Sequence, residues 1–162
     1  MMLGSALLFF YVNNTQIPRT LDTNSQEIIQ QLDNIATLNN ANFIEFYRKE
    51  LTEELNAKQS DSDKNLLENN AQLNSKQFIL TVMNQYNLSR VLYVTEPSAA
   101  RARLIVNSFS LGASWYYQYS ENGYTEETQV ESINDALKTK AEFYHLCEKT
   151  TNKHWFFCTS SD

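Results

Sequence analysis

The second half of the chain carries short apolar runs separated by turn signals, a pattern typical of strands. Three such runs occupy residues 104–106, 115–117 and 124–130. The last two are separated by Ser120-Glu121-Asn122-Gly123, and Asn-Gly adopts positive φ at low cost, which favours a hairpin turn. We therefore expect an antiparallel sheet between residues 103 and 130, with the rest of the chain packed around it.

Further runs extend this predicted sheet. From Gln77 the period of the apolar residues shifts from 3.6 towards two, which predicts a strand over residues 78–83. Residues 91–94 form a compact apolar run and predict another strand. Pro97 marks a turn, because proline is incompatible with a central strand, and the sheet resumes over residues 102–109. Residues 154–157 are predicted to form a last, buried strand.

Helical spacing appears in three other stretches. Apolar positions over residues 28–36 lie on one helical face, and Asn24 offers a capping start. A second helix is expected over residues 42–55, followed by a polar connector at 58–74. A third begins after Ser132. Its apolar stripe is predicted to hold Ile133, Ala136, Leu137, Ala141 and Tyr144.

The first 18 residues carry no charged side chain and are nearly continuously apolar from Met2 to Val12. A membrane helix needs about 20 such residues. The segment lacks the basic residues and the cleavage site of an ordinary signal peptide. We expect an uncleaved membrane anchor over residues 1–18, with residues 19–162 as the domain beyond it. An atypical export signal and a buried segment of a soluble protein are the alternatives.

The composition and charge of the chain argue against several classes of function. The formal net charge is -6 and the pI is about 4.9. Affinity for nucleic acid comes from clustered Lys and Arg, which the chain lacks, so direct nucleic-acid binding is not expected. Three glycines leave few phosphate-binding loops. No nucleophile elbow, Walker loop, dinucleotide fingerprint or metalloprotease helix is present, so we expect no enzyme and no cofactor.

Two cysteines lie near the C-terminus, Cys147 and Cys158, with ten residues between them. A hairpin or a helix-to-strand turn could bring them together, and a disulfide would require an oxidising compartment. The alternative is two unpaired thiols in a cytosolic protein. His145 and His154 fit no common zinc spacing with them, so no metal is expected.

Aromatic residues gather on one predicted strand, where Trp115, Tyr117 and Tyr119 share a face. Such a face can line an apolar ligand pocket, or it can serve as core or as a subunit interface.

The two histidines are candidates for pH sensing. His145 lies three residues from both Glu142 and Glu148, and His154 lies inside the loop that the disulfide would close. Nearby carboxylates would favour the protonated imidazole, so mild acidification could change the charge of this region. The alternative is two ordinary histidines of the surface or core.

The layout resembles the ToxS-type inner-membrane accessory proteins, most closely those of the PsaF and MyfF kind, which partner regulators of fimbrial and virulence genes. The size, the N-terminal apolar segment and the region from Leu92-Tyr93-Val94-Thr95 through Leu111-Gly112-Ala113-Ser114-Trp115 to Asn122-Gly123-Tyr124 carry this resemblance. It implies a periplasmic domain with a curved antiparallel sheet or lipocalin-like barrel. It also implies a non-catalytic role, in which the domain binds and protects a one-pass membrane transcription regulator. Relatives respond to acidity or to small amphipathic ligands.

The expected fold class is therefore α+β, with an N-terminal apolar helix, a helical segment, a curved antiparallel sheet and one C-terminal helix. The expected location is the inner membrane, with the bulk of the chain in the periplasm. A minor pilin or pseudopilin also combines an apolar helix, a sheet and a C-terminal disulfide loop. However, the first Glu here is Glu27, too late for the pilin pattern. A ligand-binding domain that works alone is the other alternative.

Overall fold

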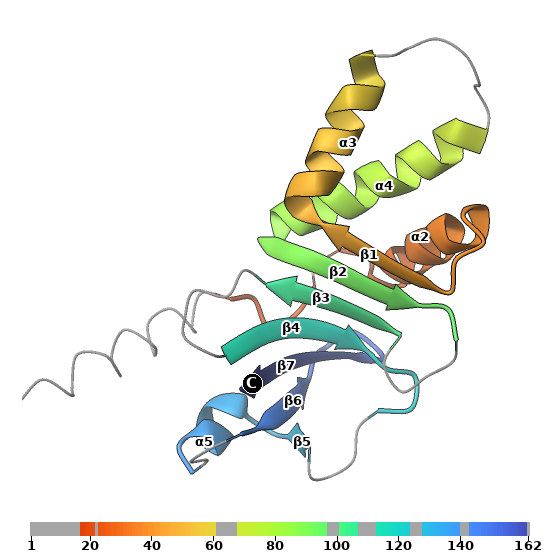
Figure 1. Ribbon diagram of the computed structural model, residues 1–162. Helices are drawn as coiled ribbons and strands as arrows, with labels where there is room; N and C mark the ends of the chain where they lie inside the picture. Colours follow the sequence, from red (N-terminus) through yellow and green to blue (C-terminus); the bar gives the residue numbers. More distant parts are fainter. Residues whose placement is uncertain are drawn as a thin grey trace, which may run out of the picture.

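The computed structural model contains a sheet of seven strands. It describes residues 17–21, 23–60, 68–96, 101–106, 113–123, 128–139 and 143–161. The strand order is β1-β2-β3-β4-β7-β6-β5 (Figure 1). The strands are β1 (Phe43–Tyr47), β2 (Leu88–Val94), β3 (Ala102–Val106), β4 (Ala113–Tyr119), β5 (Gln129–Val130), β6 (His145–Lys149) and β7 (Trp155–Ser161). The helices are α2 (Ser25–Leu38), α3 (Arg48–Ser60), α4 (Glu68–Gln85) and α5 (Ile133–Leu137).

One face of the sheet carries the helices. Figure 1 shows α2 and α4 stacked against the same side of the strands. Buried side chains of α2, such as Ile28 and Leu32, share one hydrophobic core with Tyr93, Leu104 and Tyr117 of the sheet. Because side chains alternate along a strand, the intervening residues point to the other side. We call this other side the helix-free face.

A polar cluster fastens α2 to the sheet beside this core. The hydroxyl of Tyr93 on β2 donates to the Asp33 carboxylate of α2, and Arg101 donates to the same carboxylate at 3.1 Å. Arg101 also donates to Glu121 at 3.0 Å. Burial, together with the bond to Asp33, raises the pKa of Tyr93. The phenol therefore stays protonated and remains a donor at physiological pH.

Two capping predictions are confirmed. The Asn24 side chain accepts from Gln26 N at the start of α2, and Ser132 Oγ accepts from Asp135 N at the start of α5. Residues 28–36 are helical as expected, and strands occupy the predicted positions at β2, β3, β4 and β7. The third helix ends earlier than predicted, at Leu137, so Tyr144 lies beyond it. Ala141 lies outside the described residues.

The strand predicted over residues 78–83 is wrong, because this stretch belongs to α4. The buried positions Ser75, Ile79, Val82 and Met83 of α4 recur at three and four residues, so one side of the helix is covered by the core. Residues 78–83 contain several consecutive apolar residues, so this short stretch fits both the two-residue period of a strand and the period of a helix.

The helix predicted to start near Asn42 is also wrong at its beginning. Residues Phe43–Tyr47 form β1, and α3 starts at Arg48. Aromatic residues at three of the five positions favour a strand, and β2 supplies a full antiparallel partner. The expected connector at 58–74 is shorter than predicted, because α3 reaches Ser60 and α4 begins at Glu68.

The sheet does not close into a barrel, which corrects the lipocalin-like expectation. The predicted turn is present, since Gly123 has φ +74° and Ser120 Oγ donates to its carbonyl oxygen. However, β4 pairs with β3 and β7 rather than with the segment that follows the turn. The described residues 128–130 of that segment include β5, which runs parallel to β6 at the far edge. Residues 124–127 and Pro97 lie outside the described residues.

The predicted apolar helix and anchor fall almost wholly on residues 1–16, which also lie outside the described residues. Within the described part, none of the helices combines the length and the hydropathy needed to cross a bilayer.

Candidate functional site

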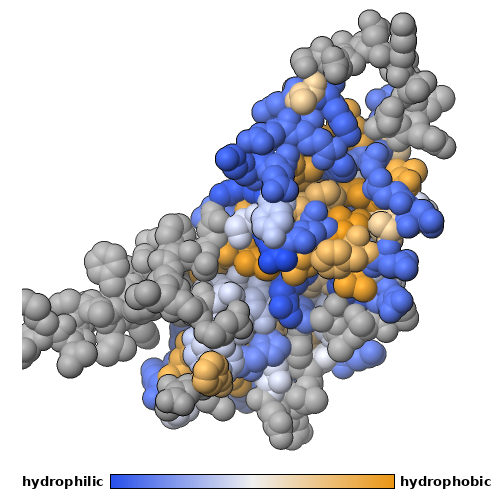
Figure 2. Space-filling view, viewed as in Figure 1, coloured by the Kyte–Doolittle hydropathy of each residue, from blue (hydrophilic) through white to orange (hydrophobic). Residues whose placement is uncertain are grey.

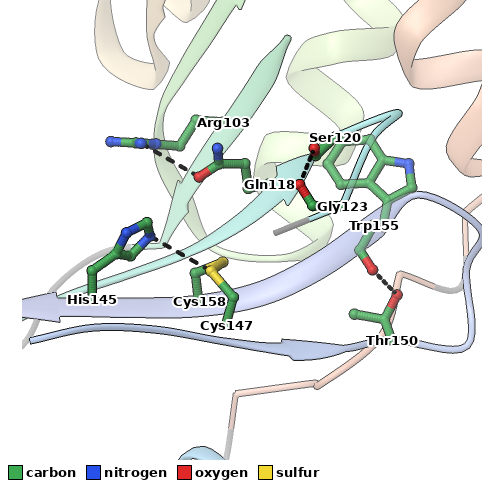
Figure 3. The surroundings of a disulfide bond; sticks show 9 residues. All are labelled: Arg103, Gln118, Ser120, Gly123, His145, Cys147, Thr150, Trp155 and Cys158. Atoms are coloured by element: carbon green, nitrogen blue, oxygen red, sulfur yellow. Dashed lines mark hydrogen bonds between the residues drawn. A yellow bond between two sulfur atoms is a disulfide. The ribbon is translucent and has the colours of Figure 1, made fainter. Parts of the chain in front are cut away.

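The predicted disulfide is present at the centre of the β6–β7 hairpin. Cys147 and Cys158 are directly opposite each other in the antiparallel register, with an S–S distance of 2.07 Å (Figure 3). Both cysteines are fully buried on the helix-free face. The alternation of the two strands thus places the bond between neighbouring strands, away from the helices.

A polar and aromatic cluster lies beside the disulfide on the same face. Tyr116 of β4 is opposite Cys158, and the Arg103 guanidinium lies 4.5 Å from the Tyr116 ring centroid. Arg103 donates to Gln118 Oε1 at 3.3 Å, which orients the guanidinium (Figure 3). His145 approaches from β6, with its Nε2 3.5 Å from Cys147 Sγ. Four strands therefore converge on one cluster.

The surroundings of His145 shift its pKa in the direction opposite to the prediction. Burial, followed by the positive charge of Arg103, lowers the pKa of His145 below its ordinary value. Of the two carboxylates expected beside His145, Glu148 points to the helix-covered face, where it accepts from Ile133 N and pairs with Arg19. Glu142 lies outside the described residues. The neutral imidazole is therefore favoured.

His154 lies at the opposite end of the hairpin. It precedes β7 with a positive φ of 65°, and its ring meets Tyr119 edge-on at 5.8 Å. Ser160, the strand partner of His145, is six residues from His154, a span of roughly 20 Å at the usual strand rise. The two predicted pH-sensing residues thus lie in separate places. His154 instead lines an open cavity of about 360 Å³ between residues 120–123 and 149–156.

The predicted aromatic face is occupied by the chain itself. Tyr117 donates its hydroxyl hydrogen to the Pro18 carbonyl oxygen, and the Arg19 guanidinium lies 5.5 Å from the Trp115 ring. Tyr119 packs edge-on against Trp155. A ligand on this face would have to displace Pro18 and Arg19. The three residues do not line the cavity beside His154.

The disulfide prevents Cys147 and Cys158 from binding a metal as thiolates beside His145. Ligand atoms of His145, Cys147 and Cys158 lie within 4.8 Å of one another. Both sulfurs are joined in the disulfide, so the imidazole alone retains a lone pair suited to a metal. The same bond removes both sulfurs as nucleophiles. The cluster can instead recognise an anion, through the oriented guanidinium of Arg103.

Sequence reasoning did not identify Arg103 or Tyr116 as part of a site. The available signal was an arginine in the middle of an apolar strand, at residues 102–106, where a long cation needs an aromatic or anionic partner. Comparison with family models, with curated proteins and with solved structures finds no match for the chain.

Removing the disulfide with the double substitution Cys147→Ala and Cys158→Ala is expected to lower the free energy of unfolding. The bond closes a loop with a sequence separation of 11, for which the loss is about 2 to 3 kcal/mol. Urea unfolding of the wild type with and without reductant, beside the double variant, measures it. The reductant should destabilise the wild type alone, and equal midpoints for the oxidised wild type and the double variant would contradict the structure.

Replacing His145 with Gln should flatten part of the acid dependence of stability. Because the folded pKa lies below the ordinary 6.5, the unfolded chain takes up the proton first, so wild-type stability falls as pH drops through this range. Thermal unfolding from about pH 7.5 to pH 5 should show His145→Gln gaining relative to the wild type at the acidic end. His154→Gln is the matched control. A gap between His145→Gln and wild type that is independent of pH would rule out this effect.

Proposed function

We propose that this chain is a non-catalytic accessory subunit of the inner membrane. In this proposal residues 1–18 anchor it, and the remainder lies in the periplasm, where it binds and stabilises a one-pass transcription regulator of fimbrial or virulence genes. The disulfide supports an oxidising compartment, because such bonds persist outside the cytoplasm. The buried sulfurs and the filled aromatic face favour binding of a protein over catalysis.

The observation that carries the proposal is the open edge at β1. Thr95 N donates to Asn42 O, so by alternation Ile44 and Phe46 bond to β2, while the backbone groups of Phe43, Glu45 and Tyr47 point outward. No other described strand pairs with this edge of β1. An edge of this kind accepts a strand from another chain.

The side chains at this edge support the same use. Phe43 is 53% exposed and Tyr47 is 42% exposed. Figure 2 shows hydrophobic residues gathered in the region of β1 and β2, below the hydrophilic surface of α3. Large exposed hydrophobic side chains on an open edge are a liability in a protein that works alone, and a partner would cover them.

Photo-crosslinking from β1 tests the function. A p-benzoylphenylalanine at position 43 should form an adduct in native cells with a single-pass membrane protein that carries a cytoplasmic DNA-binding domain. Phe143, 81% exposed and far from β1 in sequence, is the matched control position and should give no such adduct. Deleting the chain should also lower the steady-state level of the captured regulator. Adducts confined to soluble proteins or to a second copy, or no adduct at all, would contradict the proposal.

A further inference from the structure

The helix-free face is organised as two rows that cross the sheet. One row runs through paired positions of β1, β2, β3, β4, β7 and β6, and it consists of Glu45, Leu92, Arg103, Gln118, Phe156 and Lys149. The adjacent row consists of Tyr47, Arg90, Ile105, Tyr116, Cys158 and Cys147. These rows place side chains from distant parts of the sequence next to one another.

The charge of these rows opposes the charge of the whole protein. The chain has a net charge of -6, yet the two rows carry three cations, Arg90, Arg103 and Lys149, against the single carboxylate of Glu45. Glu45 forms an ion pair with Arg90. Arg103 and Lys149 have no carboxylate partner among the described residues. The rows therefore present a basic surface on an acidic protein.

The guanidinium of Arg103 is fixed in place by two neighbouring side chains. It lies over the Tyr116 ring at 4.5 Å and donates to Gln118, whose side chain is buried. These contacts leave further N–H donors of the guanidinium available, since the group has five. A guanidinium already fixed in place loses less conformational entropy when it binds a carboxylate.

Apolar groups adjoin this cation. Leu92 is directly beside Arg103 in the register, and Ile105 is next along β3. Both are only partly buried, and the exposed Phe43 and Tyr47 continue the surface to the β1 edge. The surface thus combines a central arginine with neighbouring apolar side chains. Such a surface is complementary to a peptide segment in which apolar residues flank an Asp or Glu.

A second copy of the chain fits this surface poorly. The register that would pair the whole of β1 with its own copy places Glu45 opposite Glu45, and like charges directly opposite destabilise a sheet. Two copies meeting by their helix-free faces would bring cations against cations. The charge pattern therefore favours an unlike partner.

We propose that the helix-free face at β1 to β3 is the docking surface for an acidic, amphipathic segment of the partner, whose Asp or Glu carboxylate is bound by Arg103 and whose apolar side chains cover Leu92, Ile105 and Phe43. This inference rests on the proposed function and specifies the partner's chemistry. It commits to a protein segment, because carboxylate and apolar groups must be presented together.

A random peptide display library, selected on the full-length oxidised chain, tests the chemistry of the docking surface without knowledge of the partner. Selected peptides should be enriched in Asp or Glu flanked by apolar residues. Arg103→Glu should weaken their binding by about ten- to a hundredfold, as expected for a hydrogen bond to a charged group. Peptides with Lys in place of the acidic residue should bind Arg103→Glu better than wild type, and higher salt should weaken wild-type binding.

Lys49→Glu reverses an exposed charge on α3, outside the two rows, and should leave binding unchanged. If Arg103→Glu does not fold, Lys149→Glu tests the same row at an exposed position, with a smaller loss expected. Peptides without acidic preference, equal binding by both variants, or self-association that Phe43→Ser abolishes would overturn the inference. Acid-selective peptides combined with a crosslinked partner that is not a membrane regulator would support the docking surface and refute the proposed function.

Discussion

The pairing of β4 with β7 is the constraint on which the rest of the structure depends. Seven consecutive residue pairs join these strands, from Ala113 opposite Ser161 to Tyr119 opposite Trp155. This register puts Tyr117 and Phe157 together under the helices and Tyr116 and Cys158 together on the helix-free face. A shift by one residue would exchange the two sets. The same pairing brings the C-terminal hairpin into the centre of the sheet, so the disulfide closes beside it.

The register also links the two ends of the described chain. Arg19 lies 4.6 Å from the Phe157 ring and pairs with Glu148, the neighbour of Cys147, at 3.7 Å. The backbone of Leu21 is bonded by both ends of the Asn152 amide. The segment that follows the predicted anchor is thus fixed to the disulfide hairpin. The described helices and this segment cover the same face of the sheet.

Capping residues and the spacing of apolar residues predicted much of this fold. The remaining features depend on which strands pair. The caps of α2 and α5, the strand at residues 91–94 and the cysteine pair were predictable from short spacing. The helical state of Ile79 to Met83 was not, because the run satisfies both periods and only the covering α2 decides between them. The Asn122-Gly123 turn was identified, whereas its strand partner was not, since β7 lies more than thirty residues further on. The Arg103 cluster likewise depends on register, which a single sequence does not reveal.

The described helices cover one face of the sheet, and a disulfide joins β6 to β7. We propose that the other face binds a membrane regulator. The most direct test of this account is the thiol state in native cells, because the bond requires both the β6–β7 register and an oxidising compartment. Cells are alkylated before reduction, and tryptic peptides are analysed by mass spectrometry. The account predicts that residues 141–149 and 154–162 are recovered as one cross-linked, unalkylated species. Recovery of the two peptides separately, each with an alkylated cysteine, would contradict it.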